Sequence, residues 1–159
     1  IKFRMVRDIF LNKAQYDETM FSMMKERKFN YREIYPTLFF NSSDLKKLNS
    51  LGHIVGLHSH NHPTLLAELT YDEQKSEYKK CLSSISSILD KPRSEIKVMS
   101  HPCGSYNDYT LEILKELGIE LGFKQIMTIE PERGMKKINN SFLEIARQDH
   151  AEIFKRMSQ

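Results

Sequence analysis

Residues 52–63 read GHIVGLHSHNHP, in which a glycine turn and a short apolar segment lead into three histidines within five positions. Residues 53–57 are short, apolar and preceded by a glycine, so they predict a strand. The segment before Gly52 predicts a short helix, with Ser42 or Ser43 as its cap and leucines at three-residue spacing. The three histidines therefore begin at the end of a predicted strand, and a predicted helix precedes that strand. This order of elements favours an α/β fold.

The rest of the chain repeats the alternation of helices and short apolar strands. Thr70 and Glu73 form a capping box before a helix that runs to Pro92, and Asn107 caps a second helix that Gly118 ends. The remaining predicted elements are helices at 17–27 and 151–157 and strands at 96–99, 119–123 and 143–146. The methionines of the first of these helices are expected to pack in the core. The pattern predicts parallel strands, with functional groups at their carboxyl ends.

The composition sets limits on the class of protein. The chain has 159 residues, 40% of them hydrophobic, which suits one domain. Its net charge is +3, from 24 basic and 21 acidic residues without a long basic run, so nucleic acid is not expected as a partner. The apolar runs are far shorter than the roughly 20 residues that cross a bilayer, so no membrane span is expected. Cys81 and Cys103 lie in different settings and suggest no disulfide framework.

The histidine cluster offers two ways to bind a metal. Neutral imidazole is a good ligand for zinc and related divalent ions, and a catalytic site needs about three protein ligands. In an extended strand His58, His60 and His62 share a face and neighbouring histidines form HxH pairs, whereas a turn after His58 brings His58 and His62 together. The spacing leaves both pairs open, as well as a surface turn before Pro63 without a metal. The same placement recurs at residues 100–104, SHPCG, where the next predicted strand ends.

The surroundings of both motifs resemble one known family. The stretch LKKLNSLGHIVGLHSHNHPTLLAELTYDEQKSEY is similar to the second motif and following helix of polysaccharide deacetylases, the NodB-homology carbohydrate esterases. His58, Ser59, His62 and Pro63 match that motif. SHPCGSYNDYTLEILKELGIELGF is similar to the PxG turn, helix and strand of the same family, so the resemblance covers about residues 42–125.

The resemblance implies a partial or distorted (β/α) barrel that removes acetyl groups from an N-acetylated glycan. It implies a divalent metal, commonly zinc, held by an aspartate and by His58 and His62, with a second aspartate as base. Ser59 would support the ligands, and the backbone N–H of Cys103 would donate to the oxyanion. The physical logic agrees, because a metal polarises the amide carbonyl and activates water, and N–H groups stabilise the oxyanion.

The sequence departs from the family pattern in three places. It contains no Asp-Asp pair, so the third ligand and the base are missing, and we expect residues 1–159 to be one domain truncated at its amino terminus. Ser100 stands where the family often has an arginine, and Arg147 with Asp149 is the predicted substitute, although a plain ion pair is equally compatible. The family also has a histidine near its carboxyl end that acts as an acid and protonates the leaving amine. His101 and His150 are the two candidates for it here, and the alternative for His101 is a hydrogen-bonding turn residue.

Two other functions stay open. A metal hydrolase of the PHP or amidohydrolase type would use His58 and His60, but the GHxxG lead-in, His62-Pro63 and the PCG turn favour the deacetylase. A pseudo-enzyme that binds a glycan or a protein is the second, because a chain without the Asp-Asp strand is expected to have little activity. An uncovered sheet edge would also favour self-association. The compartment stays open, with the cytoplasm slightly favoured.

Overall fold

A computed structural model describes residues 2–125, 142–147 and 150–157 of the chain. The chain forms two compact units, Ile1–Leu45 and Lys46–Gln159. Both motifs lie in the second unit. The prediction of a single truncated domain stays a prediction.

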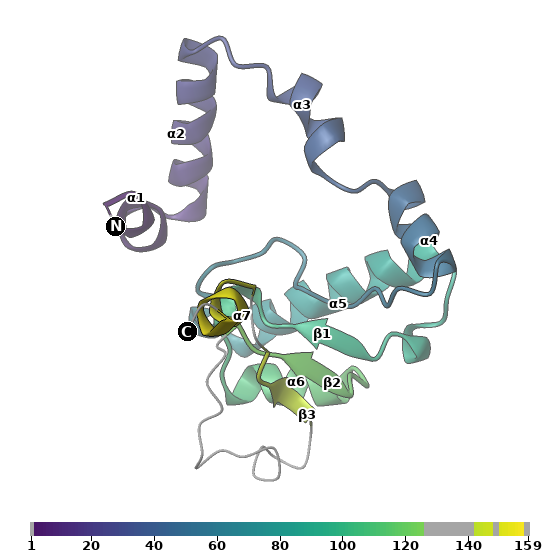
Figure 1. Cartoon of the computed structure of the whole chain (residues 1–159). Coiled ribbons are helices and arrows are strands. Elements are labelled where there is room, and N and C mark those ends of the chain that lie inside the picture. The colour runs from purple at the N-terminus through teal and green to yellow at the C-terminus, as the bar shows by residue number, and fades with distance from the viewer. Residues whose placement is uncertain (1, 126–141, 148–149, 158–159) are drawn as a thin grey trace. The chain divides into compact units, whose positions relative to one another are not determined.

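The first unit consists of helices (Figure 1). They are α1 (Lys2–Met5) with the π-helical turn Val6–Phe10, α2 (Lys13–Glu26) and α3 (Tyr31–Leu38). The structure confirms the predicted helix at 17–27 but starts it earlier, because Asn12 and Gln15 form a capping box. None of the α2 side chains is buried, so the prediction that its methionines fill a core was wrong. The α3 helix was not predicted, and it contains Pro36, a residue that usually interrupts helices.

Helix α4 (Ser42–Ser50) leads into the motif region and has a different cap from the predicted one. The Asn41 side chain accepts hydrogen bonds from the backbone N–H groups of Ser43 (2.8 Å) and Asp44 (3.1 Å). Asn41 is therefore the N-cap, in the role predicted for Ser42 or Ser43. The helix ends as predicted near Gly52, whose φ of +88° favours glycine.

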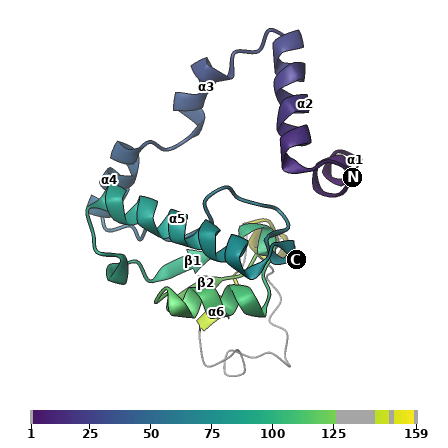
Figure 2. The same cartoon turned by 180° about the vertical axis from the view of Figure 1, so that it is seen from behind.

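The second unit is built on a small parallel sheet. Strands β1 (Val98–Ser100), β2 (Leu121–Phe123) and β3 (Phe142–Ile145) pair in that order. Figure 2 shows α5 (Tyr71–Leu89) and α6 (Asp108–Glu116) in front of the strands, so both helices cover the same face of the sheet. Short 3-10 turns at Leu66–Glu68, Arg93–Glu95 and Pro102–Gly104, and helix α7 (His150–Met157), complete the unit. The alternating elements and parallel pairing confirm the predicted α/β class.

The segment before the histidines is not a full strand. It pairs with β1 through one parallel bridge, Leu57 with Met99, in which the Leu57 N–H donates to Val98 and the Ser100 N–H donates to Leu57, each at 2.9 Å. Ile54 is 78% exposed, whereas Val55 is partly buried against the core and Leu57 is buried, so alternate side chains still face the core. Among residues 53–57, however, only Leu57 pairs with a neighbouring strand. The predicted strand is therefore reduced to its last residue.

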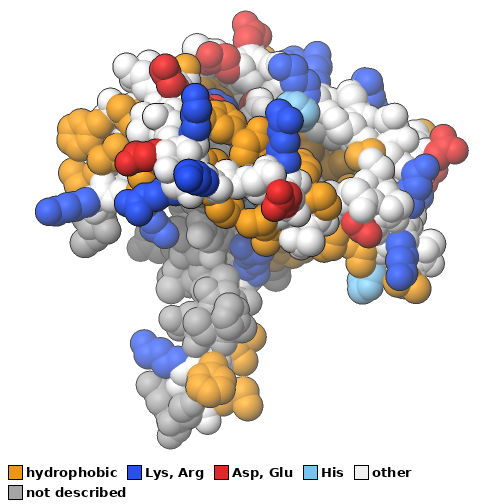
Figure 3. Space-filling view, turned by 90° about the horizontal axis from the view of Figure 1, so that it is seen from above, with side chains coloured by type: hydrophobic (Ala, Val, Ile, Leu, Met, Phe, Trp, Pro, Cys, Tyr) orange, Lys and Arg blue, Asp and Glu red, His pale blue; other side chains and the backbone are white. Residues whose placement is uncertain are grey.

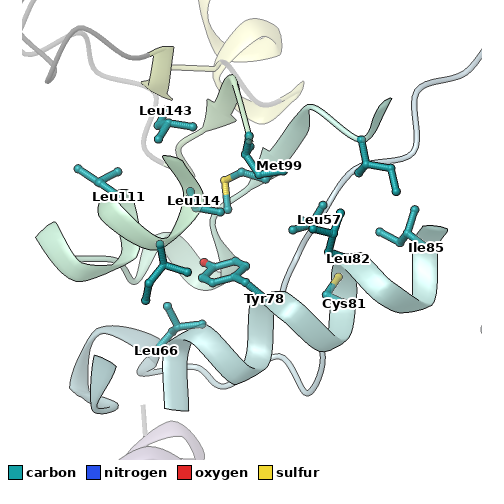
Figure 4. Packing of buried hydrophobic residues seen from close by; sticks show 13 residues of the cluster. Leu57, Leu66, Tyr78, Cys81, Leu82, Ile85, Met99, Leu111, Leu114 and Leu143 are labelled. Carbon is teal, nitrogen blue, oxygen red and sulfur yellow. The ribbon is translucent and has the colours of Figure 1, made fainter. Parts of the chain in front are cut away.

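The core lies between α5, α6 and the sheet. Tyr78, Leu82 and Ile85 of α5 are buried as the helical spacing predicted, together with Leu111 and Leu114 of α6. In Figure 4 the side chains of α5 point toward Leu57 and Met99. This packing anchors the bridge residue, and hence the start of the histidine segment, on the face of α5.

A buried polar group lies behind the end of β1. His101 is 1% exposed, and its Nε2–H donates to the Leu143 carbonyl at 2.8 Å. Its ring stacks on Tyr106 with 4.2 Å between centroids, and the Tyr106 hydroxyl donates to Glu144 at 2.7 Å. His101 Nδ1 is buried without a hydrogen-bond partner among the described residues. Burial above all lowers the pKa of His101 to about 4.

The surface mixes charge and apolar groups. On the face in Figure 3, Lys, Arg, Asp and Glu side chains are interspersed with hydrophobic ones. None of the helices in the described ranges is long and apolar enough to span a membrane.

The close approach at Gly56 gives a test of how the bridge is held. A Cβ at Gly56 would lie 2.5 Å from the Val98 carbonyl oxygen, which is backbone and has little room to move. We expect Gly56→Ala to lower the free energy of unfolding by roughly 1–3 kcal/mol, as overpacking does. Urea unfolding would measure this. The control Ile54→Ala, at an exposed site, should change the value by less than about 0.5 kcal/mol, and equal effects would contradict the close approach.

The pKa of His101 gives a pH dependence with a defined sign. The folded chain keeps this ring neutral down to about pH 4, whereas the unfolded ring takes up a proton near its ordinary pKa of 6.5. The unfolded state therefore binds more protons in this window, and stability falls as the pH drops through it. We expect about 2–3 kcal/mol of this loss between pH 7 and 4.5 to come from His101.

His101→Gln keeps an N–H donor at the Nε2 position but does not titrate, so its unfolding free energy should depend less on pH. Urea unfolding at both pH values compares the two proteins. An equally steep loss in the variant would show that His101 is not the source.

Candidate metal-binding site

The structure brings His58 and His62 together. Their ring centroids are 4.9 Å apart, with 53° between the ring planes, and both side chains reach the surface. The spacing is compatible with two imidazoles that share one ion. His60 also reaches the surface, but its ring is in no contact with this pair among the described rings.

A left-handed backbone produces this pairing. Ser59 (φ 62°) and His62 (φ 53°) both have positive φ, which is uncommon for residues with a side chain. The buried Ser59 hydroxyl accepts a hydrogen bond from the His62 N–H at 3.1 Å and so closes the turn. The chain thus leaves the extended conformation immediately after His58, and the arrangement that would put His58 and His60 on one face of a strand does not form.

The ring of His58 is oriented and kept neutral by its surroundings. Its Nδ1 lies 2.8 Å from the Ser100 carbonyl oxygen, an acceptor, so Nδ1 carries the proton and Nε2 keeps its lone pair. Burial of part of the ring lowers its pKa, the hydrogen bond to Ser100 opposes this, and the charges of His62 and Arg147 lower it further. A neutral ring with a free Nε2 is the form that binds a metal.

The donor set fits part of a metal site. His58 and His62 supply two of the three protein ligands that catalytic zinc sites use. Within the described ranges, no cluster of three histidine, cysteine, aspartate or glutamate side chains completes it. The pair therefore supplies two donors of the kind that divalent metal sites use.

The Pro102–Gly104 turn lies next to the histidines, because Ser100 contacts His58. Cys103 is exposed and left-handed, with φ 51°, and Gly104 follows at φ 68°. The backbone N–H of Cys103 belongs to this exposed turn. Its role as the oxyanion donor stays a prediction.

The other predicted site residues have different positions. His101 lies behind the turn, buried and neutral, where it supports β3 through Leu143. Arg147 follows β3, and its positive charge helps to lower the pKa of His58. Asp149 lies outside the described residues, and His150 begins α7 with its side chain outside the description.

Sequence reasoning missed two supporting carboxylates. Glu77 of α5 binds the backbone of the histidine turn, and Glu144 of β3 is buried against Tyr106. Glu77 occupies a polar position of an amphipathic helix, and Glu144 lies within an apolar strand. A carboxylate in the 143–146 strand was a visible signal for burial with a partner, whereas spacing alone gives no sign of the Glu77 contacts.

Comparisons with known proteins agree with these features. The family profile described as polysaccharide deacetylase matches residues 9–122. A solved structure, the Streptococcus pyogenes deacetylase PplD in complex with acetate, is similar with a TM-score of 0.56 and 22% sequence identity. The similarity covers 76% of this chain and 51% of that one, so the chain spans about half the length of that structure. A search of curated proteins found no match.

The structural likeness shows the fold. The small parallel sheet with its helices corresponds to part of the barrel of a deacetylase, as the resemblance of the motifs implied. The profile match covers both the histidine turn and the PCG turn, which lie side by side in the structure. We conclude that the chain belongs to the polysaccharide deacetylase family.

Proposed function

We propose that this protein takes part in metal-dependent N-deacetylation of an N-acetylated sugar in a glycan. The observation that carries the proposal is the pairing of His58 and His62 beside the turn that presents the Cys103 N–H. Family membership supports deacetylation. The choice of a divalent metal, with zinc as the first candidate, rests on two imidazoles with free lone pairs.

Each group has a distinct task in the proposed reaction. His58 and His62 would hold the ion, and a bound divalent ion would supply polarisation of the amide carbonyl and activation of water. Hydrolysis consumes one water and releases acetate and the free amine. The Cys103 N–H donates to the oxygen that becomes negative as the carbonyl is attacked. Because Arg147 places positive charge near His58, it also favours negative charge at this site.

The Ser100 carbonyl keeps the proton of His58 on Nδ1, so Nε2 stays unprotonated and would be the atom that binds an ion. Such an outer hydrogen bond fixes the tautomer and orientation of a ligand. The lowered pKa of His58 keeps the ring available at mildly acidic pH. Protonation of His58 should therefore compete with metal binding at lower pH than it would for a histidine with an ordinary pKa.

The rival arrangement, with His58 and His60 as ligands, has less support. The turn that Ser59 closes pairs His58 with His62, and the backbone of His60 is bound to Glu77 instead. A hydrolase of the PHP or amidohydrolase type would need the extended conformation that this segment does not adopt.

Single substitutions of the three histidines test the ligand assignment. We expect His58→Ala and His62→Ala to weaken zinc binding by roughly 100-fold or more. This loss is larger than the one expected when a residue that only hydrogen-bonds to a metal ligand is removed. His60→Ala, the matched control in the same turn, should change the affinity by less than about threefold, because its ring is outside the pair. Calorimetric zinc titration of the purified chain measures all three.

The same variants test the activity in the longest form that the gene encodes. Acetate release from N-acetylglucosamine oligomers should require added metal and should fall with His58→Ala and His62→Ala, but not with His60→Ala. Zinc binding that survives loss of His62 but not of His60 would overturn the assignment. Zinc binding without acetate release would favour a glycan-binding role.

A further inference from the structure

We propose that Glu77 is the positioning residue of this site, whose carboxylate holds the turn 58–62 in the conformation that pairs His58 with His62. The inference rests on the proposed metal site but concerns a residue outside the family motif. Glu77 binds the turn from the helix that follows it, and it touches neither histidine ring of the pair.

The carboxylate makes three hydrogen bonds to the turn. Its Oε2 accepts from the backbone N–H groups of His60 at 3.0 Å and Asn61 at 2.7 Å. Its Oε1 accepts from the Asn61 side-chain amide at 2.6 Å. Charge-assisted bonds of this kind are roughly twice as strong as neutral ones. Both residues between Ser59 and His62 are therefore fixed to a single side chain.

The turn needs such support because its backbone is strained. Ser59 and His62 lie in the left-handed region on either side of the two residues that Glu77 binds. Strained residues persist only where the surrounding structure holds them, and they cluster at functional sites. The Ser59 hydroxyl closes the turn from inside, and Glu77 holds it from outside.

Helix α5 is a rigid base for that carboxylate. A capping box fixes its start, and the neighbouring Tyr78 is fully buried. One turn further along the same face, Cys81 is buried next to His58, and a hydrogen bond with the His58 backbone opposes the increase of its pKa that burial causes. The helix thus contacts the turn at both His58 and His60–Asn61, so the histidine spacing is tied to the core.

Two conservative substitutions of Glu77 separate the effect of where its side chain ends from the effect of its negative charge. Glu77→Gln keeps the reach of the side chain and, with a rotated Asn61 amide, all three hydrogen bonds, but removes the charge. Glu77→Asp keeps the charge and shortens the side chain by one methylene, so the carboxylate no longer reaches the turn. Glu112→Gln, an exposed carboxylate on α6, is the control for the change in net charge.

We expect Glu77→Asp to raise the zinc dissociation constant of the chain by about 10- to 100-fold, the usual cost of losing an outer partner of a ligand. Glu77→Gln keeps the three contacts as weaker neutral hydrogen bonds, so it should raise the constant less than Glu77→Asp does, and Glu112→Gln should leave it within about threefold. In the metal-free chain, amide exchange of His60 and Asn61 should be at least about tenfold faster in Glu77→Asp. Titration calorimetry and NMR hydrogen exchange give the two readouts.

The reverse order, with weaker zinc binding in Glu77→Gln than in Glu77→Asp, would show that the charge matters and would overturn the proposal. Unchanged zinc affinity in Glu77→Asp would overturn it as well, whatever the exchange rates. If the unsubstituted chain binds no zinc, the proposed function fails by itself. Amide exchange then decides whether Glu77 holds the turn, since unchanged rates in Glu77→Asp would contradict it.

Discussion

The single parallel bridge between Leu57 and Met99 is the constraint on which the site depends. Its two hydrogen bonds bind the chain before the histidines to β1, where Leu57 is buried against α5. His58 therefore lies next to Ser100, the residue that leads into the PCG turn. Without this bridge the two motifs, 42 residues apart in sequence, would not share one edge of the sheet.

The site combines an exposed, strained turn with buried polar support. His58 and His62 face solvent, while the Ser59 hydroxyl binds the backbone N–H of His62 and Glu77 binds the backbone of the two residues before it. Ligands that are held in place before binding lose less conformational freedom when the metal arrives. Behind the turn, His101 is buried as a neutral ring and connects two strands, a structural task for a histidine at a functional edge.

Most elements of the second unit followed from local signals, since capping boxes and glycine stops act within one turn of helix. The helix at 71–89 and the pairing of the metal motif with its family were both readable in this way. The strand at 53–57 was not, because an apolar segment becomes a strand only if a partner binds along its whole length. The methionines of α2 gave a misleading signal, because helical spacing shows which residues share a face but not whether another element covers that face.

The sequence by itself determined the family, the caps of helices α5 and α6 and the order of both motifs after apolar segments, since these depend on residue types at short spacing. Only the tertiary structure decided that the ring beside His58 is that of His62 and not of His60, because this depends on backbone angles at Ser59 and on contacts with a helix that begins nine residues after His62. It also made His101 a buried support and not an exposed acid. Burial and hydrogen bonding across distant segments set the tautomer, charge and direction of a histidine, and no local pattern encodes them.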